Sequence, residues 1–190
     1  MCSTIVYKWV TSRMLYLFQP CHVLNAGLIY LAFNPGRFRV AKTGADLPSI
    51  VFAVYLHSMY GGWLGLCLPD TRDLKMPGEV VSFFTQHVLL CFLPIFYIAR
   101  GRYNMYAPRI FYCWAFKFLY HSNVLLPLSI VFSGNLNYMM VPPQGPLLVA
   151  GRFYRPVMGA VCVVLTVVMR LVLVNVCQWA FVRRVSPKQE

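Results

Sequence analysis

Long apolar runs separated by short polar breaks set the pattern of this chain. Six such runs stand out, and most have about the 20 residues that a helix needs to cross the hydrocarbon core of a bilayer. Hydropathy of this kind predicts an all-α, polytopic transmembrane helix bundle with about five or six membrane segments. The expected segments are 5–18, 21–33, 47–68, 80–98, 109–132 and 157–182.

Prolines and turn residues mark where these runs break. Gln19 and Pro20 separate the first two runs, and the sequence Asn-Pro-Gly at 34–36 ends the second with a strong turn signal. The second run would form a helix of only about 20 Å, which is too short to cross a core of about 30 Å. We therefore expect a half-helix there, or a helix that extends by tilt and snorkelling ends. Pro94 is expected to kink the fourth run.

Composition supports a membrane protein and disfavours several other classes. The chain is 59% hydrophobic and 12% charged, whereas soluble domains average about 45–50% and about 25%. Its net charge of +12 is scattered without a basic run, so no nucleic-acid partner is expected, and anionic lipid headgroups are the simpler counter-charge. The seven cysteines include no CxxC pair, which disfavours a zinc knuckle or a thioredoxin motif.

The charges of the loops predict an orientation. Nine basic residues lie in 34–46, in 99–109 and in the tail after 182, whereas four lie in 69–79 and 133–155. The positive-inside rule therefore places the first three regions, and with them the C-terminus, in the cytoplasm. Whether the short second run crosses the membrane decides on which side of the membrane the residues before it lie.

Four histidines lie in or at the edge of apolar runs. Ionisable groups inside a membrane are expensive to keep, usually face a bundle interior or a wet cavity, and are functional candidates. Histidine also exchanges a proton near neutrality. No HxxxH or HxxH pair exists, so the spacing predicts no metal site. The four are His22, His57, His87 and His121.

A thiol lies beside the first of these histidines. If Pro20 is the first helical residue, Cys21 falls in the first turn, where free N–H groups and the helix dipole stabilise a thiolate. That setting is typical of a nucleophilic cysteine. The alternative is a buried structural cysteine beside a histidine, His22, that caps the helix or snorkels.

Further polar groups accompany the later runs. Cys113, Lys117 and His121 are spaced i, i+4, i+8, so they form one helical stripe that we expect to face the interior. Two amides in the following loop, Asn135 and Asn137, are either turn formers or ligands for a polar headgroup.

Three functions are compatible with buried polar groups of this kind. The first is chemistry at a membrane-buried site that uses the thiol and the imidazoles. The second is transport, in which the histidines and Arg170 line a path for protons or a solute. The third is a non-catalytic structural or partner-binding role, in which the histidines are hydrogen-bond links between helices.

Several short motifs occur together in a recognisable order from about residue 5 to about residue 155. They are Tyr16-Leu17-Phe18-Gln19-Pro20-Cys21-His22, Leu56-His57, Gln86-His87-Val88, Tyr120-His121-Ser122, Asn135-Leu136-Asn137-Tyr138-Met139 and Tyr154-Arg155. With these motifs the chain resembles the transmembrane protein 164 family of multi-pass membrane proteins. All four histidines fall on histidine positions of that family, which is more specific than any one motif.

The resemblance implies a membrane-embedded acyltransferase that moves a fatty acyl chain, notably a polyunsaturated one, onto lyso or ether phospholipid. By position it implies Cys21 as the acyl-accepting nucleophile and His87 as its base, with His121 as the second choice. No cofactor is expected beyond an acyl donor such as acyl-CoA or another phospholipid. Membrane lipids and a lysophospholipid acceptor are the expected partners, in an integral, multi-pass setting that includes the endomembranes. Supporting or substrate-binding roles are implied for His22, His57, Asn135, Asn137 and Arg155.

The chain departs from the family pattern in three places. Family members carry a longer N-terminal region, so 1–18 is expected to be the remainder of a truncated helix. It would belong to a single membrane domain, 1–190, that ends in a polar tail at 183–190. Gln19 stands where the family has Asn, which weakens the cap of the following helix. The histidine that the family carries near its last helix has no counterpart in the sequence Thr-Val-Val-Met-Arg at 166–170.

Overall fold

The computed structural model describes residues 2–34, 46–72, 74–100, 102–103, 110–143, 146–176 and 179. Within these residues the regular elements are helices, and no strand occurs, so the all-α prediction is confirmed. In chain order they are α1 (Cys2–Val10), η1 (Met14–Phe18), α2 (Pro20–Phe33), α3 (Leu47–Ser58), α4 (Tyr60–Cys67), α5 (Glu79–Ala99), α6 (Ile110–Tyr120), η2 (His121–Leu125), α7 (Leu126–Val131), η3 (Leu136–Tyr138), η4 (Pro146–Phe153), α8 (Tyr154–Met169) and η5 (Arg170–Val176).

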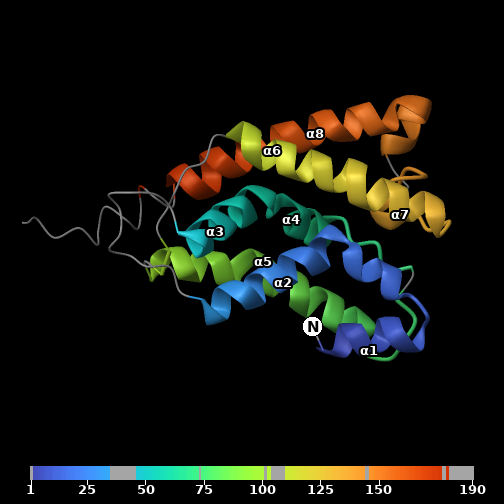
Figure 1. Cartoon of the computed structure of the whole chain (residues 1–190), viewed down its shortest axis with the longest axis horizontal. Coiled ribbons are helices and arrows are strands. Elements are labelled where there is room, and N and C mark those ends of the chain that lie inside the picture. Colours follow the sequence, from blue (N-terminus) through green and yellow to red (C-terminus); the bar gives the residue numbers. More distant parts are fainter. Residues whose placement is uncertain are drawn as a thin grey trace, which may run out of the picture.

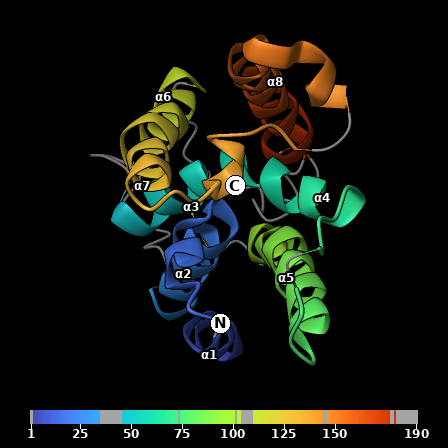
Figure 2. The ribbon, with the colours of Figure 1, turned by 90° about the vertical axis from the view of Figure 1, so that its right-hand side faces the viewer.

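Helices α3 and α4 lie in the middle of the bundle. Figure 2 shows them between two helix pairs, with α6 and α8 on one side and α2 and α5 on the other, and Figure 1 shows the same order from the side. Half of the α3–α4 span is buried inside the protein, compared with 11% of the span that contains α8. The sequence therefore folds around its third apolar run, and α8 lies at the periphery.

The core is built from apolar and aromatic side chains that α2, α3 and α5 direct at one another. Leu31, Phe52 and Leu90 are almost fully buried in it. The hydroxyl of Tyr55 donates a hydrogen bond to the carbonyl oxygen of Leu90 over 2.8 Å, which ties α3 to α5. Burial of this kind stabilises a helix packing through dispersion contacts as well as through removal of apolar surface from water.

Local sequence signals explain where α2 begins and ends. Gln19 has an extended conformation, and Pro20 fits the first helical turn because a proline needs no N–H donor there. At the other end the side-chain amide of Asn34 donates to the carbonyl oxygen of Tyr30 over 2.9 Å. The predicted start of this helix is confirmed, and Cys21 does lie in its first turn.

Helix α5 begins at a charged contact with α1. Gly78 precedes it with a φ of 78°, a conformation that glycine adopts without strain. The carboxylate of Glu79 accepts hydrogen bonds from the backbone N–H groups of Lys75 and Met76. It also pairs with Lys8 of α1 over 3.3 Å, and both side chains are buried. This pair fixes α1 against the start of α5.

Within the described residues, three helices are long and apolar enough to cross a membrane by length and composition: Leu47–Cys67, Glu79–Ala99 and Leu148–Leu173. Helix α2 is apolar but shorter, as expected from its run. Large apolar side chains such as Val81, Phe92 and Val164 are exposed on the outer faces of α5 and α8, and an apolar exterior suits contact with lipid. The number of membrane crossings stays a prediction.

The helices depart from the expected runs in three places. The first run is divided by residues 11–13 into α1 and η1, and the third is interrupted at Met59. The fifth contains a π-helical stretch, η2, that starts at His121. Much of the charged sequence behind the predicted orientation, at 35–45, 104–109 and 180–190, lies outside the described residues. So does the polar tail.

Candidate functional site

Three of the four histidines share one hydrogen bond within their own helix. In each, Nδ1 lies 2.7–2.8 Å from the carbonyl oxygen of the residue four positions earlier. A carbonyl only accepts, so this contact assigns the proton to Nδ1 and leaves Nε2 as the basic nitrogen. The pairs are His57 with Ala53, His87 with Phe83, and His121 with Lys117.

His22 is the exception because it lies in the first turn of α2, so the residue four positions before it, Phe18, belongs to η1 and not to the same helix. His22 is 7% exposed, and its Nδ1 is buried with no hydrogen-bond partner among the described residues. The side-chain nitrogen of Asn25 is in the same state at 8% exposure. Buried polar atoms in native proteins nearly always have a partner. Each of these two nitrogen atoms can therefore form a hydrogen bond with a group from outside the chain.

Cys21 shares this face of α2. It lies four residues before Asn25, so the two side chains are neighbours on the helix surface. The thiol is partly buried, packs against the main core and contacts the backbone N–H of His22. The first turns of α2 thus present a thiol and two polar side chains together, and Asn25 is the member that the sequence reasoning missed. Its spacing from Cys21 and His22 was the available signal.

His87 reaches the same region from α5. Lys8 and His87 are close enough to interact electrostatically with the ring of His22. The ring of His87 packs against Gly65 of α4 so closely that a Cβ there would lie 2.4 Å from Cδ2. Among the hydrogen bonds of the described residues, none joins the sulfur of Cys21 to a histidine nitrogen. The structure thus brings the thiol, His22 and His87 into one region without a direct thiol–imidazole bond.

A second polar cluster lies on the other side of α3. The ammonium of Lys117 donates to the carbonyl oxygen of His57 over 2.9 Å and to Oγ1 of Thr166 over 2.5 Å. It also lies 4.6 Å from the ring centroid of Tyr60. Arg170 donates to Nε2 of His57 over 3.4 Å. The predicted interior stripe is confirmed for Lys117, and Thr166 is a member that sequence reasoning did not pick as a site residue.

His121 belongs to a third group at the far end of α6. Its Nε2 accepts a hydrogen bond from the side-chain amide of Asn137 over 2.8 Å. Asn137 and the next residue, Tyr138, both have positive φ, at 45° and 61°. Two consecutive residues in this conformation are unusual for side chains other than glycine, and such positions concentrate at functional sites. This backbone shape directs Asn137 back toward His121.

An exposed ion pair continues from that loop. The hydroxyl of Tyr138 donates to the carboxylate of Asp70 over 3.0 Å, and Arg72 donates to the same carboxylate over 2.6 Å and 2.8 Å. The hydrogen bonds from Arg72 lower the pKa of Asp70 to about 2. The loop after α7 is therefore connected to the loop between α4 and α5.

The remaining predicted residues have local contacts. The side chain of Asn135 accepts from the backbone N–H groups of Met140 and Val141 and donates to the carbonyl oxygen of Val141, so it shapes its own loop. Arg155 donates to the hydroxyl of Tyr154 over 3.3 Å. No described contact joins either residue to the three groups of polar residues that contain the histidines. In the described part of the chain, no group of three or more His, Cys, Asp and Glu side chains is arranged to hold a metal ion.

In the part of the chain that the structure describes, an all-α bundle with three apolar helices of spanning length and buried ionisable groups is typical of a helical membrane protein. The chain belongs to the TMEM164 family, whose model matches residues 1–173. It is similar to the Transmembrane protein 164 homolog of Dictyostelium discoideum, with 25% identity over 143 residues, which are 73% of this chain and 49% of that protein. The chain thus spans about half the length of this curated relative. No solved structure matches.

Proposed function

We propose that this chain carries out membrane-embedded acyl transfer, in which a fatty acyl chain moves onto a lyso or ether phospholipid through a thioester on Cys21. The observation that carries the proposal is the polar face at the start of α2. A thiol lies there beside two buried polar side chains, and among the described residues Nδ1 of His22 and the side-chain nitrogen of Asn25 have no hydrogen-bond partner. An ester or thioester group is a polar ligand that this face would complement.

The reaction has two half-steps. The thiol of Cys21 loses its proton to a base, and the thiolate attacks the acyl carbonyl of the donor to form a thioester. The donor's leaving group, a phospholipid oxygen or a CoA sulfur, departs with a proton. A lysophospholipid hydroxyl then loses its proton to the base and attacks the thioester carbonyl. The new ester forms, and Cys21 recovers its proton.

His87 is the proposed base, with His121 as the second choice. The tautomer of His87 suits this role because its Nε2 is the basic nitrogen. No described hydrogen bond joins it to the thiol, and catalytic hydrogen bonds often form fully only in the complex with substrate. His22 is the proposed substrate ligand nearest the thiol, whereas His57, Asn135, Asn137 and Arg155 would act at a distance from it.

The setting of the proposed reaction is an integral, multi-pass membrane protein, with an endomembrane as one possible location. The acyl donor would be acyl-CoA or a phospholipid, and no other cofactor takes part. The apolar exterior of α5 and α8 supports a lipid environment for both substrates. Family membership supports the membrane setting and leaves the chemistry to be tested.

The test is acyl labelling of the purified chain in nanodiscs. An alkyne-tagged acyl donor is added, and hydroxylamine-sensitive label and product phospholipid are both measured. We expect Cys21→Ser to lose label and product, and His87→Ala to lower the rate of both. The matched control is Cys67→Ser, because Cys67 is an exposed thiol at the end of α4 and should keep full activity. Purified protein excludes acylation by other enzymes.

Two outcomes would contradict the proposal. Label that persists in Cys21→Ser would exclude this thiol as the nucleophile. Product formation without hydroxylamine-sensitive label in the wild type would exclude a thioester. If the chain neither labels nor forms product but moves protons or a solute across vesicles, the transport alternative replaces the enzyme.

A further inference from the structure

The buried face of α2 changes from polar to apolar along the helix. Its buried residues are His22, Asn25, Leu28 and Leu31, so leucines follow the two polar side chains. Leucine serves for packing one turn later on the same face, and packing alone therefore does not call for an amide at Asn25. This residue is 8% exposed, and its Nδ2 has no hydrogen-bond partner among the described residues. An unpaired buried donor destabilises a fold, and departures of this kind are expected at functional sites.

The amide of Asn25 is placed over the thiol. Side chains of a helix lean toward its N-terminus, so a residue covers the turn before its own. For Asn25 that turn holds Cys21, four residues earlier, and His22, three residues earlier. The Cβ atoms of such neighbours are about 5–6 Å apart. An oxygen on a carbon that is bonded to the sulfur of Cys21 would therefore come within reach of Nδ2 of Asn25.

Other donors that interact with Cys21 are already in use. The backbone N–H groups of Cys21 and His22 contact the sulfur itself, where they favour a thiolate. Lys8 is held in its ion pair, and the hydroxyl of Tyr120 donates to a backbone carbonyl oxygen of η1 over 2.6 Å. An imidazole nitrogen donates in only one tautomer, whereas an amide nitrogen always donates. Within the described residues, Asn25 is therefore the donor beside this thiol that is best placed to serve a new acceptor.

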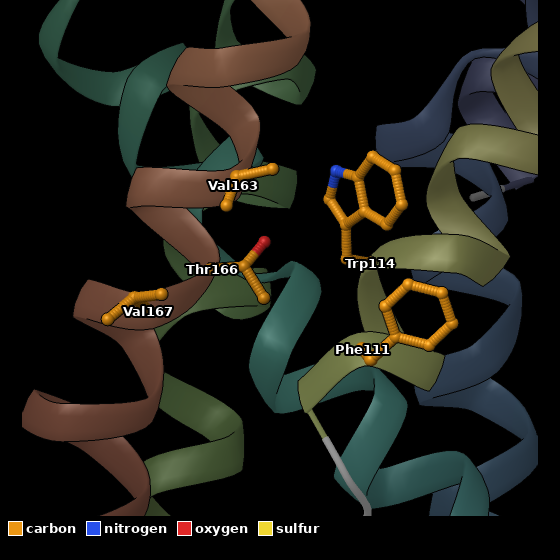
Figure 3. A pocket seen from close by; sticks show the side chains of 5 residues that line it. All are labelled: Phe111, Trp114, Val163, Thr166 and Val167. Atoms are coloured by element: carbon orange, nitrogen blue, oxygen red, sulfur yellow. The ribbon is translucent and has the colours of Figure 1, made fainter.

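The groove between α6 and α8 offers no comparable donor. Figure 3 shows the two aromatic side chains of α6 facing the side chains of α8 across it. The hydroxyl of Thr166 donates to the carbonyl oxygen of Cys162 over 2.7 Å and accepts from Lys117. A reacting carbonyl would thus find its hydrogen bond at α2 and not in this groove. The described lining residues, whose surface toward the groove is apolar, are Phe111, Trp114, Val163, Thr166 and Val167.

Acyl transfer needs a donor beside the thiol because negative charge develops on the acyl oxygen. When the thiolate attacks, a carbon–sulfur bond forms and the π electrons of the carbonyl move onto its oxygen. Collapse of this intermediate restores the carbonyl, and the electron pair of the broken bond leaves with a phospholipid oxygen or the sulfur of CoA, which takes up a proton. An N–H group aimed at the charged oxygen lowers the barrier to both steps.

We propose that Nδ2 of Asn25 donates a hydrogen bond to the oxygen of the reacting acyl carbonyl, which makes Asn25 a catalytic residue. This inference rests on the proposed function and names the group that stabilises its intermediate. The hydrogen bond strengthens as the oxygen becomes charged. Loss of the donor should therefore lower kcat and leave KM nearly unchanged, because the interaction belongs to the transition state.

The first test compares variants of the purified chain in nanodiscs. Asn25→Leu removes the donor at similar volume, and the rates of label and product formation are measured over a range of donor concentrations. We expect kcat to fall about 100- to 1,000-fold. Asn25→Asp should lose at least as much, because a carboxylate repels the developing charge. The matched control is Asn34→Leu, since that amide belongs to the other end of α2 and donates to the carbonyl oxygen of Tyr30.

Thermal unfolding separates a catalytic amide from a structural one. The buried nitrogen of Asn25 has no described partner, so Asn25→Leu should unfold at the temperature of the wild type or above it. Asn34→Leu loses a hydrogen bond and should unfold at a slightly lower temperature, with its rate of acyl transfer retained.

A long-chain trifluoromethyl ketone tests the donor without an acceptor lipid. Its carbonyl carbon bonds to the thiolate of Cys21, and its oxygen takes the negative charge, as in the intermediate. Fluorine NMR detects this adduct. We expect Asn25→Leu to weaken adduct formation about 100-fold, Asn34→Leu to leave it unchanged, and Cys21→Ser to abolish it.

The outcomes distinguish this inference from the proposal on which it rests. A wild type that forms the thioester, with the same kcat and the same adduct affinity in Asn25→Leu, would overturn the role of Asn25 alone. A raised KM at unchanged kcat, or a lost rate together with a lowered unfolding temperature, would also overturn it in favour of a binding or structural role. A wild type that forms neither label nor adduct would contradict the proposed function, and the role of Asn25 would fall with it.

Discussion

Two buried cations lie on opposite sides of α3, and the groups that surround them differ. Lys8, between α1 and α5, has a carboxylate partner, Glu79, which also accepts two backbone hydrogen bonds. Among the described residues, Lys117, between α3, α6 and α8, contacts a carbonyl, a hydroxyl and an aromatic ring. The first charge is neutralised by a carboxylate of the same chain, whereas the described neighbours of the second charge are neutral.

The difference separates a cation in an ion pair from a cation whose described neighbours are all neutral. A buried ion pair such as Lys8–Glu79 holds two helices in register. It stabilises the fold only when both members are present, because either charge alone would be buried without a partner. A cation that is held only by neutral acceptors can accept an anion without breaking a salt bridge. The same contrast applies to the histidines, because three use Nδ1 within their own helix whereas Nδ1 of His22 has no partner.

The largest effect is expected when the buried ion pair is broken. Glu79→Gln leaves the ammonium of Lys8 buried without a carboxylate, and loss of one member of a buried pair costs about 3–5 kcal/mol. The double variant Lys8→Met/Glu79→Gln should recover most of that loss, since no isolated charge remains. Unfolding in detergent by denaturant measures both. A double variant as unstable as Glu79→Gln would show that the unpaired ammonium of Lys8 is not the cause of the lost stability.

A packing change on the same side of the bundle should have the next largest effect. Gly65→Ala places a methyl group 2.4 Å from the ring of His87, and overpacking of this kind costs about 1–3 kcal/mol. Gly61→Ala in the same helix meets nothing within 4 Å and is the matched control. Thermal unfolding should separate the two variants. Equal melting temperatures would mean that the α4–α5 contact adjusts freely.

The opposite cluster should tolerate loss of its cation better. Lys117→Met removes the charge and leaves two neutral acceptors, the carbonyl of His57 and the hydroxyl of Thr166. An unsatisfied buried acceptor costs about 1–3 kcal/mol, partly offset because no ammonium is buried any longer. We therefore expect Lys117→Met to destabilise less than Glu79→Gln in the same denaturant experiment. The reverse order would contradict the contrast between the two regions.

Much of the fold followed from hydropathy and a few local signals. The apolar runs predicted the helical segments to within a few residues, and Pro20 marked the start of α2. The interruption at Met59 and the π-helical stretch at His121 did not follow, because tertiary packing decides where a long apolar run bends. The predicted interior stripe is confirmed for Cys113 and Lys117, which are buried, whereas His121 is only partly buried.

The site was less accessible to sequence reasoning. Lys8 and Glu79 lie 71 positions apart, and no local pattern pairs them. Asn137 reaches His121 only because its backbone adopts a positive φ. Nor could spacing show that Nδ1 of His22 lacks a partner, since that depends on the helices packed around it. Periodicity identifies faces of helices, whereas contacts between distant segments require the three-dimensional arrangement.

The smallest effect is expected at the exposed pair of Asp70 and Arg72, because solvent screens the attraction between the two charges. This pair is the solvent-exposed reference for the two buried cations. Hydrogen bonds from Arg72 lower the pKa of Asp70 from 3.8 to about 2. A carboxyl whose pKa falls on folding stabilises the folded state above its unfolded pKa and loses that contribution as the pH falls through the folded value. Asp70→Asn should therefore melt slightly below the wild type at pH 5, and the gap should close between pH 4 and about pH 2. The gap between Gly61→Ala and the wild type should not change with pH, since that substitution involves no titratable group. A gap for Asp70→Asn that is constant with pH would mean that the carboxylate charge contributes nothing to the loop contact.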